Sequence, residues 1–204
     1  ETGFSTVVLS ATSGPIILSV LAESREEQLV TEGVDISAYT LTGSDGADDV
    51  IEVQSEIGFV VEGASGADTL IGGGGDDTLI GGGGDDVFVV DGGEDVIDGG
   101  AGRDALDFSV SVAGVQVDLS TGTLVDGEGF GDQFSSIEVV TGSDAVDTLV
   151  GSDGDDTLIG GGGADTLIGG GGDDVFVVDG GEDVIERGEG LDEQDFSASA
   201  SGVT

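Results

Sequence analysis

The sequence lacks several residue types on which common folds and active sites depend. Its 204 residues include no cysteine, histidine, tryptophan, methionine or lysine. Without cysteine, no disulfide can strengthen the fold. Without cysteine and histidine, a Ser/His/Asp triad, a Cys/His pair and an HExxH zinc site are all excluded.

Long apolar runs and basic segments are also missing. No stretch of about 18 apolar residues is present, so we expect no transmembrane helix, and the N-terminus lacks the basic segment of a signal peptide. Three basic residues oppose 44 acidic ones, and the net charge is −41. Nucleic acids and anionic membranes carry the same sign of charge, so neither is expected as a partner. Cations are the expected partners.

Large apolar side chains are scarce, whereas glycine is abundant. Hydrophobic residues make up 37% of the chain and aromatic residues 4%, while 42 residues are glycine. Glycine loses the most backbone entropy on folding, so a thick conventional core is not expected. Such a composition suits either a thin repetitive fold or a disordered chain.

A nine-residue period favours the repetitive fold. In each unit the fourth position is small, the sixth is Asp and the eighth is nearly always a large apolar residue. The units begin at Gly43, at Gly63, Gly72, Gly81, Val90 and Gly99, and at Gly142, Gly151, Gly160, Gly169, Val178 and Arg187. The segment 81–97 also recurs without change at 169–185, so the chain contains an internal duplication.

This pattern, GGxGxDxUx with U a large apolar residue, resembles the calcium-binding nonapeptide repeats of the repeats-in-toxin (RTX) family. The resemblance covers residues 43–107 and 142–195. It implies an all-β fold, a right-handed parallel β-roll solenoid, in which calcium lies between loops and loop carbonyls complete each coordination shell. The first glycine is missing at Val90, Val178 and Arg187, and the apolar residue is missing at Gln194, so we expect weak or no binding there.

The spacing has a direct physical interpretation. Positions one to six need a tight turn that glycine allows, and positions seven to nine form a short strand whose eighth residue points inward. Two units make one turn of 18 residues, and successive turns stack about 4.8 Å apart. A calcium ion, with oxygen ligands at about 2.3–2.6 Å, fits between two loops stacked in this way. Loops eighteen residues apart should therefore share an ion.

The candidate ligands follow from this register. The expected pairs are Asp68 with Asp86, Asp86 with Asp104, Asp77 with Asp95, Asp147 with Asp165, Asp165 with Asp183, Asp156 with Asp174 and Asp174 with Asp192, and Asp48 with Asp68 is an eighth candidate whose separation is twenty. The resemblance adds the loop carbonyls of Gly81, Gly82, Gly83, Gly84, Gly160, Gly161, Gly162, Gly163, Gly169, Gly170, Gly171 and Gly172. About seven or eight ions are expected. The position-five acids Asp76, Asp85, Asp155 and Asp173 are interpreted as solvated side chains.

Four segments are expected along the chain. Residues 1–42 form a strand-rich cap with a short helix, 43–107 a first calcium-binding block, 108–141 a metal-free strand-rich connector, and 142–204 the second block. We expect the connector to continue one solenoid with longer turns, and two β-rolls joined by a strand-rich connector are the alternative. Because the sequence ends as a second copy of the connector begins, we expect the rest of a larger polypeptide to accompany it.

The repeat accounts for nearly every well-placed carboxylate, so no glycosidase-like pair is left and no enzymatic activity is expected. The leading hypothesis is a calcium-binding structural module of a secreted bacterial adhesin, toxin or exoenzyme, of the kind exported by type I secretion, that folds outside the cell. The alternative is an adhesive module that recognises a glycan or a cell-surface protein. Aliphatic rows at position nine also suggest a lateral self-contact.

Overall fold

The computed structural model describes residues 17–21, 40–43, 46, 48–54, 58–125 and 131–197. Every element in these ranges is a β-strand, so the described part of the chain is all-β, as the sequence predicts. The expected N-terminal helix lies outside the described residues. The chain divides into two compact units, Glu1–Asp104 and Ala105–Thr204.

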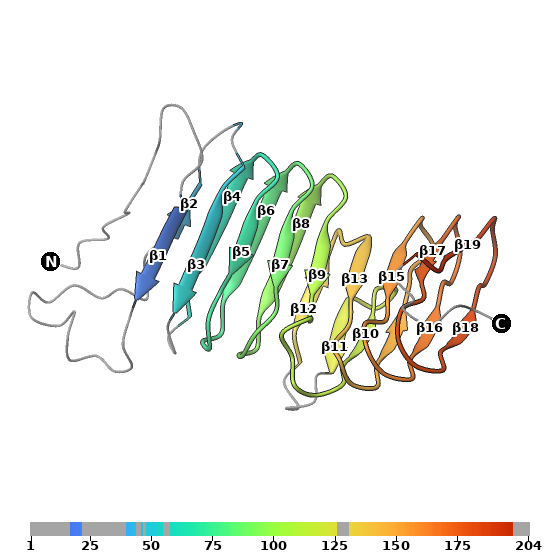
Figure 1. Cartoon of the computed structure of the whole chain (residues 1–204). Coiled ribbons are helices and arrows are strands. Elements are labelled where there is room, and N and C mark those ends of the chain that lie inside the picture. Colours follow the sequence, from blue (N-terminus) through green and yellow to red (C-terminus); the bar gives the residue numbers. More distant parts are fainter. Residues whose placement is uncertain are drawn as a thin grey trace, which may run out of the picture. The chain divides into compact units, whose positions relative to one another are not determined.

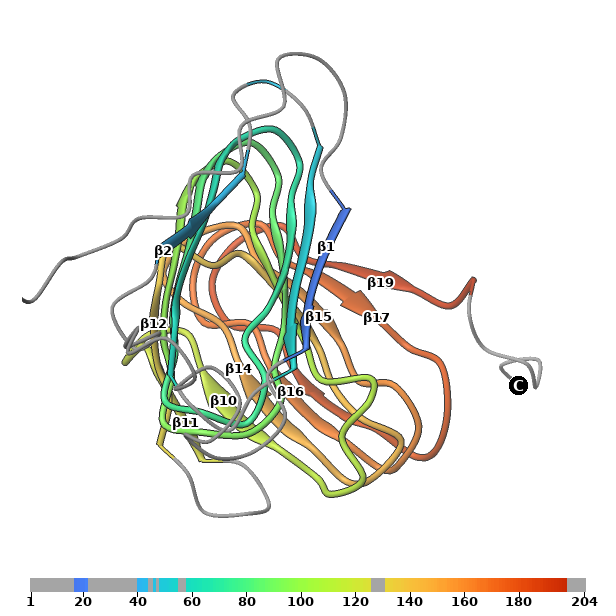
Figure 2. The ribbon, with the colours of Figure 1, turned by 90° about the vertical axis from the view of Figure 1, so that its left-hand side faces the viewer.

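Unit 1 contains two parallel sheets (Figure 1). One sheet has the strands β1 (Ile17–Leu21), β3 (Val50–Gln54), β5 (Thr69–Ile71) and β7 (Val87–Val89), and the other has β2 (Thr40–Thr42), β4 (Val60–Ser65), β6 (Thr78–Gly83) and β8 (Val96–Ala101). The chain alternates between the two sheets, and from β4 onward each strand pairs with the strand 18 residues later, as Leu70 does with Phe88. In Figure 2 the two sheets form opposite walls of a flattened coil.

Unit 2 repeats this construction with one interruption. Its first sheet has β9 (Ala105–Asp107), β13 (Val139–Thr141), β15 (Thr157–Ile159), β17 (Val175–Val177) and β19 (Glu193–Asp195), and its second has β12 (Gln133–Ser135), β11 (Thr123–Val125), β10 (Gln116–Asp118), β14 (Thr148–Val150), β16 (Thr166–Ile168) and β18 (Val184–Glu186). Pairing is parallel except in β10–β11 and β11–β12, which are antiparallel. The connector strand β10 pairs parallel with β14, so it belongs to the stack.

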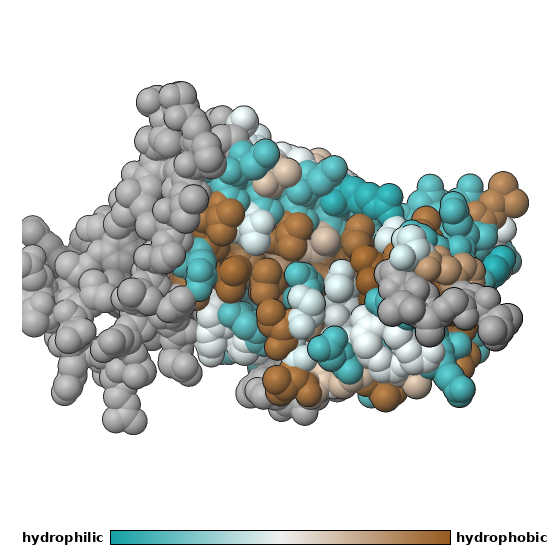
Figure 3. Space-filling view, in the orientation of Figure 1, coloured by the Kyte–Doolittle hydropathy of each residue, from teal (hydrophilic) through white to brown (hydrophobic). Residues whose placement is uncertain are grey.

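Each sheet contributes one row of inward side chains to the core. The position-eight residues Leu70, Leu79, Phe88, Leu158, Leu167 and Phe176 are at most 1% exposed, which confirms their predicted direction. Positions seven and nine of the same strands are half-buried. In the last turn Gln194 takes the inward place beside Phe176. Figure 3 shows apolar side chains interspersed with polar ones on the outer surface.

Phe176 offers a test of this one-residue-deep core. Replacing Phe176 by Ala should lower the free energy of unfolding by about 3–5 kcal/mol, because a fully buried phenylalanine leaves a cavity. Phe196 is the control, since 42% of its surface is already exposed and Phe196→Ala should cost clearly less. Urea unfolding at saturating calcium measures both variants. Equal losses would contradict a core formed by position eight.

Candidate metal centre

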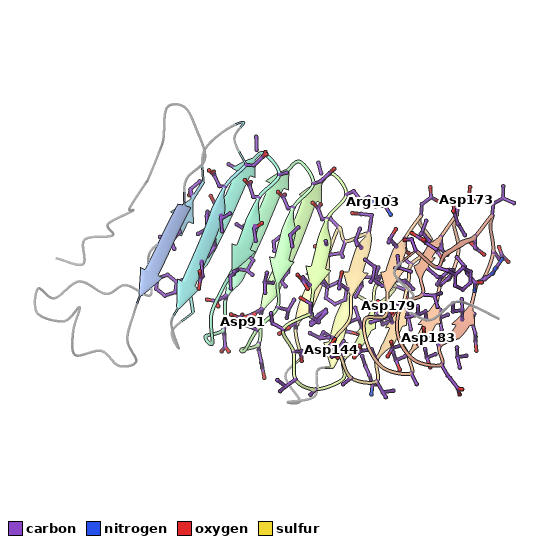
Figure 4. All side chains as sticks on the ribbon, in the orientation of Figure 1. Asp91, Arg103, Asp144, Asp173, Asp179 and Asp183 are labelled. Carbon is purple, nitrogen blue, oxygen red and sulfur yellow. The ribbon has the colours of Figure 1, made fainter. Side chains whose placement is uncertain are left out.

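Buried aspartates line both edges where the chain passes from one sheet to the other. We call the position-six residues the inner aspartates: Asp68, Asp77, Asp86, Asp95, Asp104, Asp147, Asp156, Asp165, Asp174, Asp183 and Asp192, together with Asp49. Asp183 and Asp192 are half-buried, whereas all the others are at most 2% exposed. In unit 2, Figure 4 places Asp173 at one edge and Asp144 and Asp183 at the opposite edge. Carboxylates are rarely buried without a partner, so their contacts are informative.

A ladder of hydrogen bonds joins the inner aspartates of successive turns. The main-chain N–H of one inner aspartate donates to Oδ1 of the inner aspartate one turn later, at 2.7–3.1 Å. The pairs are Asp49 with Asp68, Asp68 with Asp86, Asp77 with Asp95, Asp86 with Asp104, Asp147 with Asp165, Asp156 with Asp174, Asp165 with Asp183 and Asp174 with Asp192. The structure therefore brings together all seven pairs that are separated by eighteen residues.

The eighth pair differs by one residue from the expectation. Asp49 is the buried carboxylate in the loop that begins at Gly43, and its N–H donates to Asp68 at 2.7 Å. Asp48 is exposed and accepts the N–H of Ala67 instead. This loop contains one residue more than a regular unit, so counting six positions from Gly43 reaches Asp48, the residue before the buried Asp49. The placement of Asp48 at the shared edge is corrected to Asp49.

The second carboxylate oxygen of most inner aspartates has no donor. In the described residues, buried oxygens without a hydrogen-bond partner include Oδ2 of Asp68, Asp77, Asp86, Asp165, Asp174 and Asp183, and Oδ1 of Asp156. Buried polar atoms in proteins nearly always have a partner. A carboxylate oxygen is an acceptor only, so it needs a proton or a cation.

Glycine positions show where these open oxygens converge with main-chain carbonyls. A Cβ on Gly63 would lie 2.7 Å from the carbonyl oxygen of Gly81 and would also collide with Oδ2 of Asp68. A Cβ on Gly81 would lie 2.5 Å from the carbonyl oxygen of Gly99 and would collide with Oδ2 of Asp86. Oxygens from two successive turns thus meet at the bare face of one glycine.

This donor set fits calcium. Calcium takes six to eight oxygen ligands in flexible geometry, including carboxylates and main-chain carbonyls. The described residues bring no three acidic side chains together as a metal cluster, so carbonyls would have to supply part of the shell. The loop glycines permit this, since Gly82, Gly84, Gly161, Gly163, Gly170 and Gly172 all have φ between 84° and 134°, where other residues are strained. Calcium ions would be held by the inner aspartates together with the carbonyls of the loops 81–84, 160–163 and 169–172.

Burial raises the pKa of several inner aspartates. Burial is the largest cause for Asp68, Asp77 and Asp165, whose pKa rises from 3.8 to about 6, and nearby acidic side chains add to it. The pKa of Asp86, Asp156 and Asp174 is raised for the same first reason. In each case hydrogen-bond donors lower the pKa by less than burial raises it. Burial and neighbouring acidic side chains both disfavour the charged form of these carboxylates, and a cation bound beside them would favour it.

The position-five aspartates have a role that the sequence did not reveal. The outer aspartates Asp76, Asp85, Asp155 and Asp173 are exposed as predicted, and Asp48, which was expected at the shared edge, is exposed with them. Each of the five accepts a main-chain N–H from the next turn at 2.8–3.0 Å. The donors are Ala67, Glu94, Arg103, Asp173 and Leu191. In the inner ladder the direction is opposite, because the N–H of the earlier turn donates to the aspartate of the later turn. An Asp–Asp dipeptide thus bonds to the turns on both sides.

The loops that depart from the repeat pattern keep their place in the stack. Asp95, Asp183 and Asp192 all take part in the inner ladder. In the two loops that begin with valine, an aspartate at position two also reaches back one turn: Asp91 accepts the N–H of Gly73 at 2.9 Å and Asp179 that of Gly161 at 3.1 Å. Weak calcium binding in these loops stays a prediction.

Two stacked sheets, 18-residue turns and edges lined with paired carboxylates define the chain as a parallel β-solenoid of the β-roll class. A family model for the RTX calcium-binding nonapeptide repeat matches in four copies, at residues 62–97, 81–109, 141–176 and 160–193. The chain belongs to the RTX calcium-binding repeat family, and these repeats make it a calcium-binding structural module. Comparison with curated proteins gives no match. Within the described residues, no helix could cross a membrane.

The raised pKa values predict an unusual pH dependence when calcium is removed. The folded-state pKa of Asp68, Asp77 and Asp165 is about 6, against 3.8 ordinarily. The folded state therefore binds more protons than the unfolded state between these values, so stability falls as pH rises through them. Thermal unfolding in chelator should give a higher Tm at pH 5 than at pH 7.5. Calcium should reverse this order, and a pH-independent Tm in chelator would contradict the assignment.

Adjacent aspartates should respond differently to substitution. Asp86→Ala removes an open oxygen and the acceptor of the buried Asp68 N–H, so more calcium should be needed for folding, and the loss should reach or exceed the usual range of about 0.5–3 kcal/mol. Asp77→Ala should need less extra calcium than Asp86→Ala, because Asp86 lies between two inner aspartates. Asp85→Ala removes only the exposed acceptor of Arg103 N–H and should cost about 0.5–1.5 kcal/mol.

Calcium titrations followed by circular dichroism compare these variants. Asp85→Asn is the matched control, because it removes the charge and keeps an acceptor oxygen. It should remain close to the parent. If Asp85→Ala and Asp86→Ala shifted the calcium midpoint equally, bulk charge would explain the aspartates better than shared coordination.

Proposed function

We propose that this chain is the calcium-folded module of a secreted bacterial protein, in which it acts as a spacer or folding trigger for a larger adhesin, toxin or exoenzyme. The observation that carries the proposal is the row of buried carboxylate oxygens without hydrogen-bond donors between successive turns. The eight inter-turn pairs support about seven or eight ions. Calcium would supply the positive charge that the sequence lacks.

The charge balance supports folding outside the cell. With a net charge of −41, turns stacked without cations repel one another. Extracellular calcium modules bind at about 10⁻⁴ to 10⁻³ M, far above cytosolic free calcium. The chain would therefore stay extended during export and fold afterwards, which couples folding to location.

A structural role has more support than catalysis or adhesion. The inner aspartates hold main-chain amides of the preceding turn, so they are committed to the stack and we propose no enzymatic activity. An adhesive module usually presents aromatic anchors. The exposed large apolar residues described here are mainly valines, with Leu191 and Phe196 near the end of unit 2.

The direct test is far-UV circular dichroism in chelator, then with calcium, then with magnesium. We expect a weak strand signal in chelator at pH 7.5 and a much stronger one after calcium is added. Magnesium should substitute poorly, because it demands a tight octahedron and loses water reluctantly. A full strand spectrum in chelator at pH 7.5 would contradict calcium-dependent folding.

A further inference from the structure

In the second block, two repeat loops carry serine at position two, where the two loops that follow them carry glycine. These serine loops are residues 142–147 and 151–156, which begin the second block. The loops that follow them on the same edges, 160–165 and 169–174, have Gly161 and Gly170 at that position. The chain thus offers two matched comparisons between a serine loop and a glycine loop.

The serines bond to the inner aspartate of their own loop. Ser143 donates its N–H to Oδ2 of Asp147 at 2.7 Å, and its Oγ lies 3.0 Å and 3.2 Å from the two carboxylate oxygens. Ser152 donates its N–H and its Oγ–H to Oδ2 of Asp156, at 2.6 Å and 3.0 Å. Each Oγ also accepts an N–H two residues later, from Ala145 and from Gly154, at 3.0 Å. Each serine therefore closes its loop internally.

Backbone conformation explains why the glycine loops do not do this. Gly161 and Gly170 have φ of +84° and +99°, in the left-handed region. Ser143 and Ser152 are not among the non-glycine residues with positive φ. The main-chain amide points elsewhere as a result, and the N–H of Gly161 donates to Asp179 in the next turn. The N–H of Ser143 instead donates within its own loop.

The two kinds of loop differ in the oxygen they leave open. Oδ2 of Asp165 and of Asp174 is buried and has no donor. Both oxygens of Asp147 have donors, since Val115 donates its N–H to Oδ1 at 2.7 Å. In Asp156, Oδ2 has its serine donors and only Oδ1 is without a partner. The serine thus occupies the oxygen that a glycine loop offers to a cation.

We propose that Ser143 and Ser152 close the first loops of the second block against calcium, with a main-chain N–H and a hydroxyl in place of the cation. The inference rests on the proposed function, and it identifies two of the expected calcium sites as weaker than the others with a regular loop. The sites between Asp147 and Asp165 and between Asp156 and Asp174 bind calcium less tightly than a site between two glycine loops, such as that between Asp86 and Asp104. The serine loops keep their shape without calcium and form the base on which the later turns stack.

The test compares Ser143→Gly and Ser152→Gly with the parent. Ser120→Gly is the matched control, because Ser120 also donates its hydroxyl to an aspartate, Asp118, at 2.6 Å, outside the repeats. Native mass spectrometry counts bound ions as free calcium rises, with about 10⁻⁴ M as the informative range. Circular dichroism in chelator measures the structure that persists without ions.

Each repeat variant should hold about one more ion than the parent at limiting calcium, since glycine restores the open oxygen. Each should also show less strand signal in chelator, whereas Ser120→Gly should leave the ion count unchanged. Ser152→Ala removes only the hydroxyl and should fall between Ser152→Gly and the parent.

If the parent binds calcium and the repeat variants match Ser120→Gly, the inference is overturned while the proposed function stands. A parent that binds no calcium overturns the proposed function itself. A glycine variant that fails to fold even in saturating calcium also overturns the inference, because glycine occupies this position in the loops that follow.

Discussion

The fold depends on how a buried aspartate is satisfied at the end of each half-turn. One carboxylate oxygen accepts a main-chain N–H from the preceding turn, as Oδ1 of Asp86 does from Asp68 at 2.8 Å. The other oxygen faces a carbonyl of the following turn across a glycine. The hydrogen bond sets the register of neighbouring turns, and the open oxygen creates a demand for positive charge. Stacking and cation binding are therefore one arrangement, because the same side chain serves both.

This arrangement explains the composition. A core one side chain deep buries little apolar surface per residue, which is unfavourable for a glycine-rich chain. Ions bound between turns can replace part of the missing hydrophobic stabilisation. Glycine is then required for geometry, since a Cβ at Gly81 would displace the oxygens that form the site. The excess of acidic residues places many like charges on the stack, and bound cations would offset their repulsion.

The loops are not equivalent, although their sequences look alike. Outer aspartates such as Asp85 link a turn to the next one through an exposed carboxylate. Asp91 and Asp179 reach back one turn from position two. Ser143 and Ser152 satisfy their own aspartates. The residues at positions two and five thus determine whether a loop bonds to a neighbouring turn, bonds to its own aspartate or leaves an oxygen open for a cation. Position six is Asp in every unit.

Periodicity alone predicted the strands, the inward position eight and seven of the eight inter-turn pairs, because each depends only on counting residues in a regular coil. Counting failed where the coil is irregular: the loop after Gly43 contains one extra residue, so Asp49 occupies the buried place. It also could not show that Asp85 binds the next turn or that Ser143 closes its own loop. Those contacts depend on the φ angle at one position and on which amide of a neighbouring turn comes within reach, and only the stacked structure determines them.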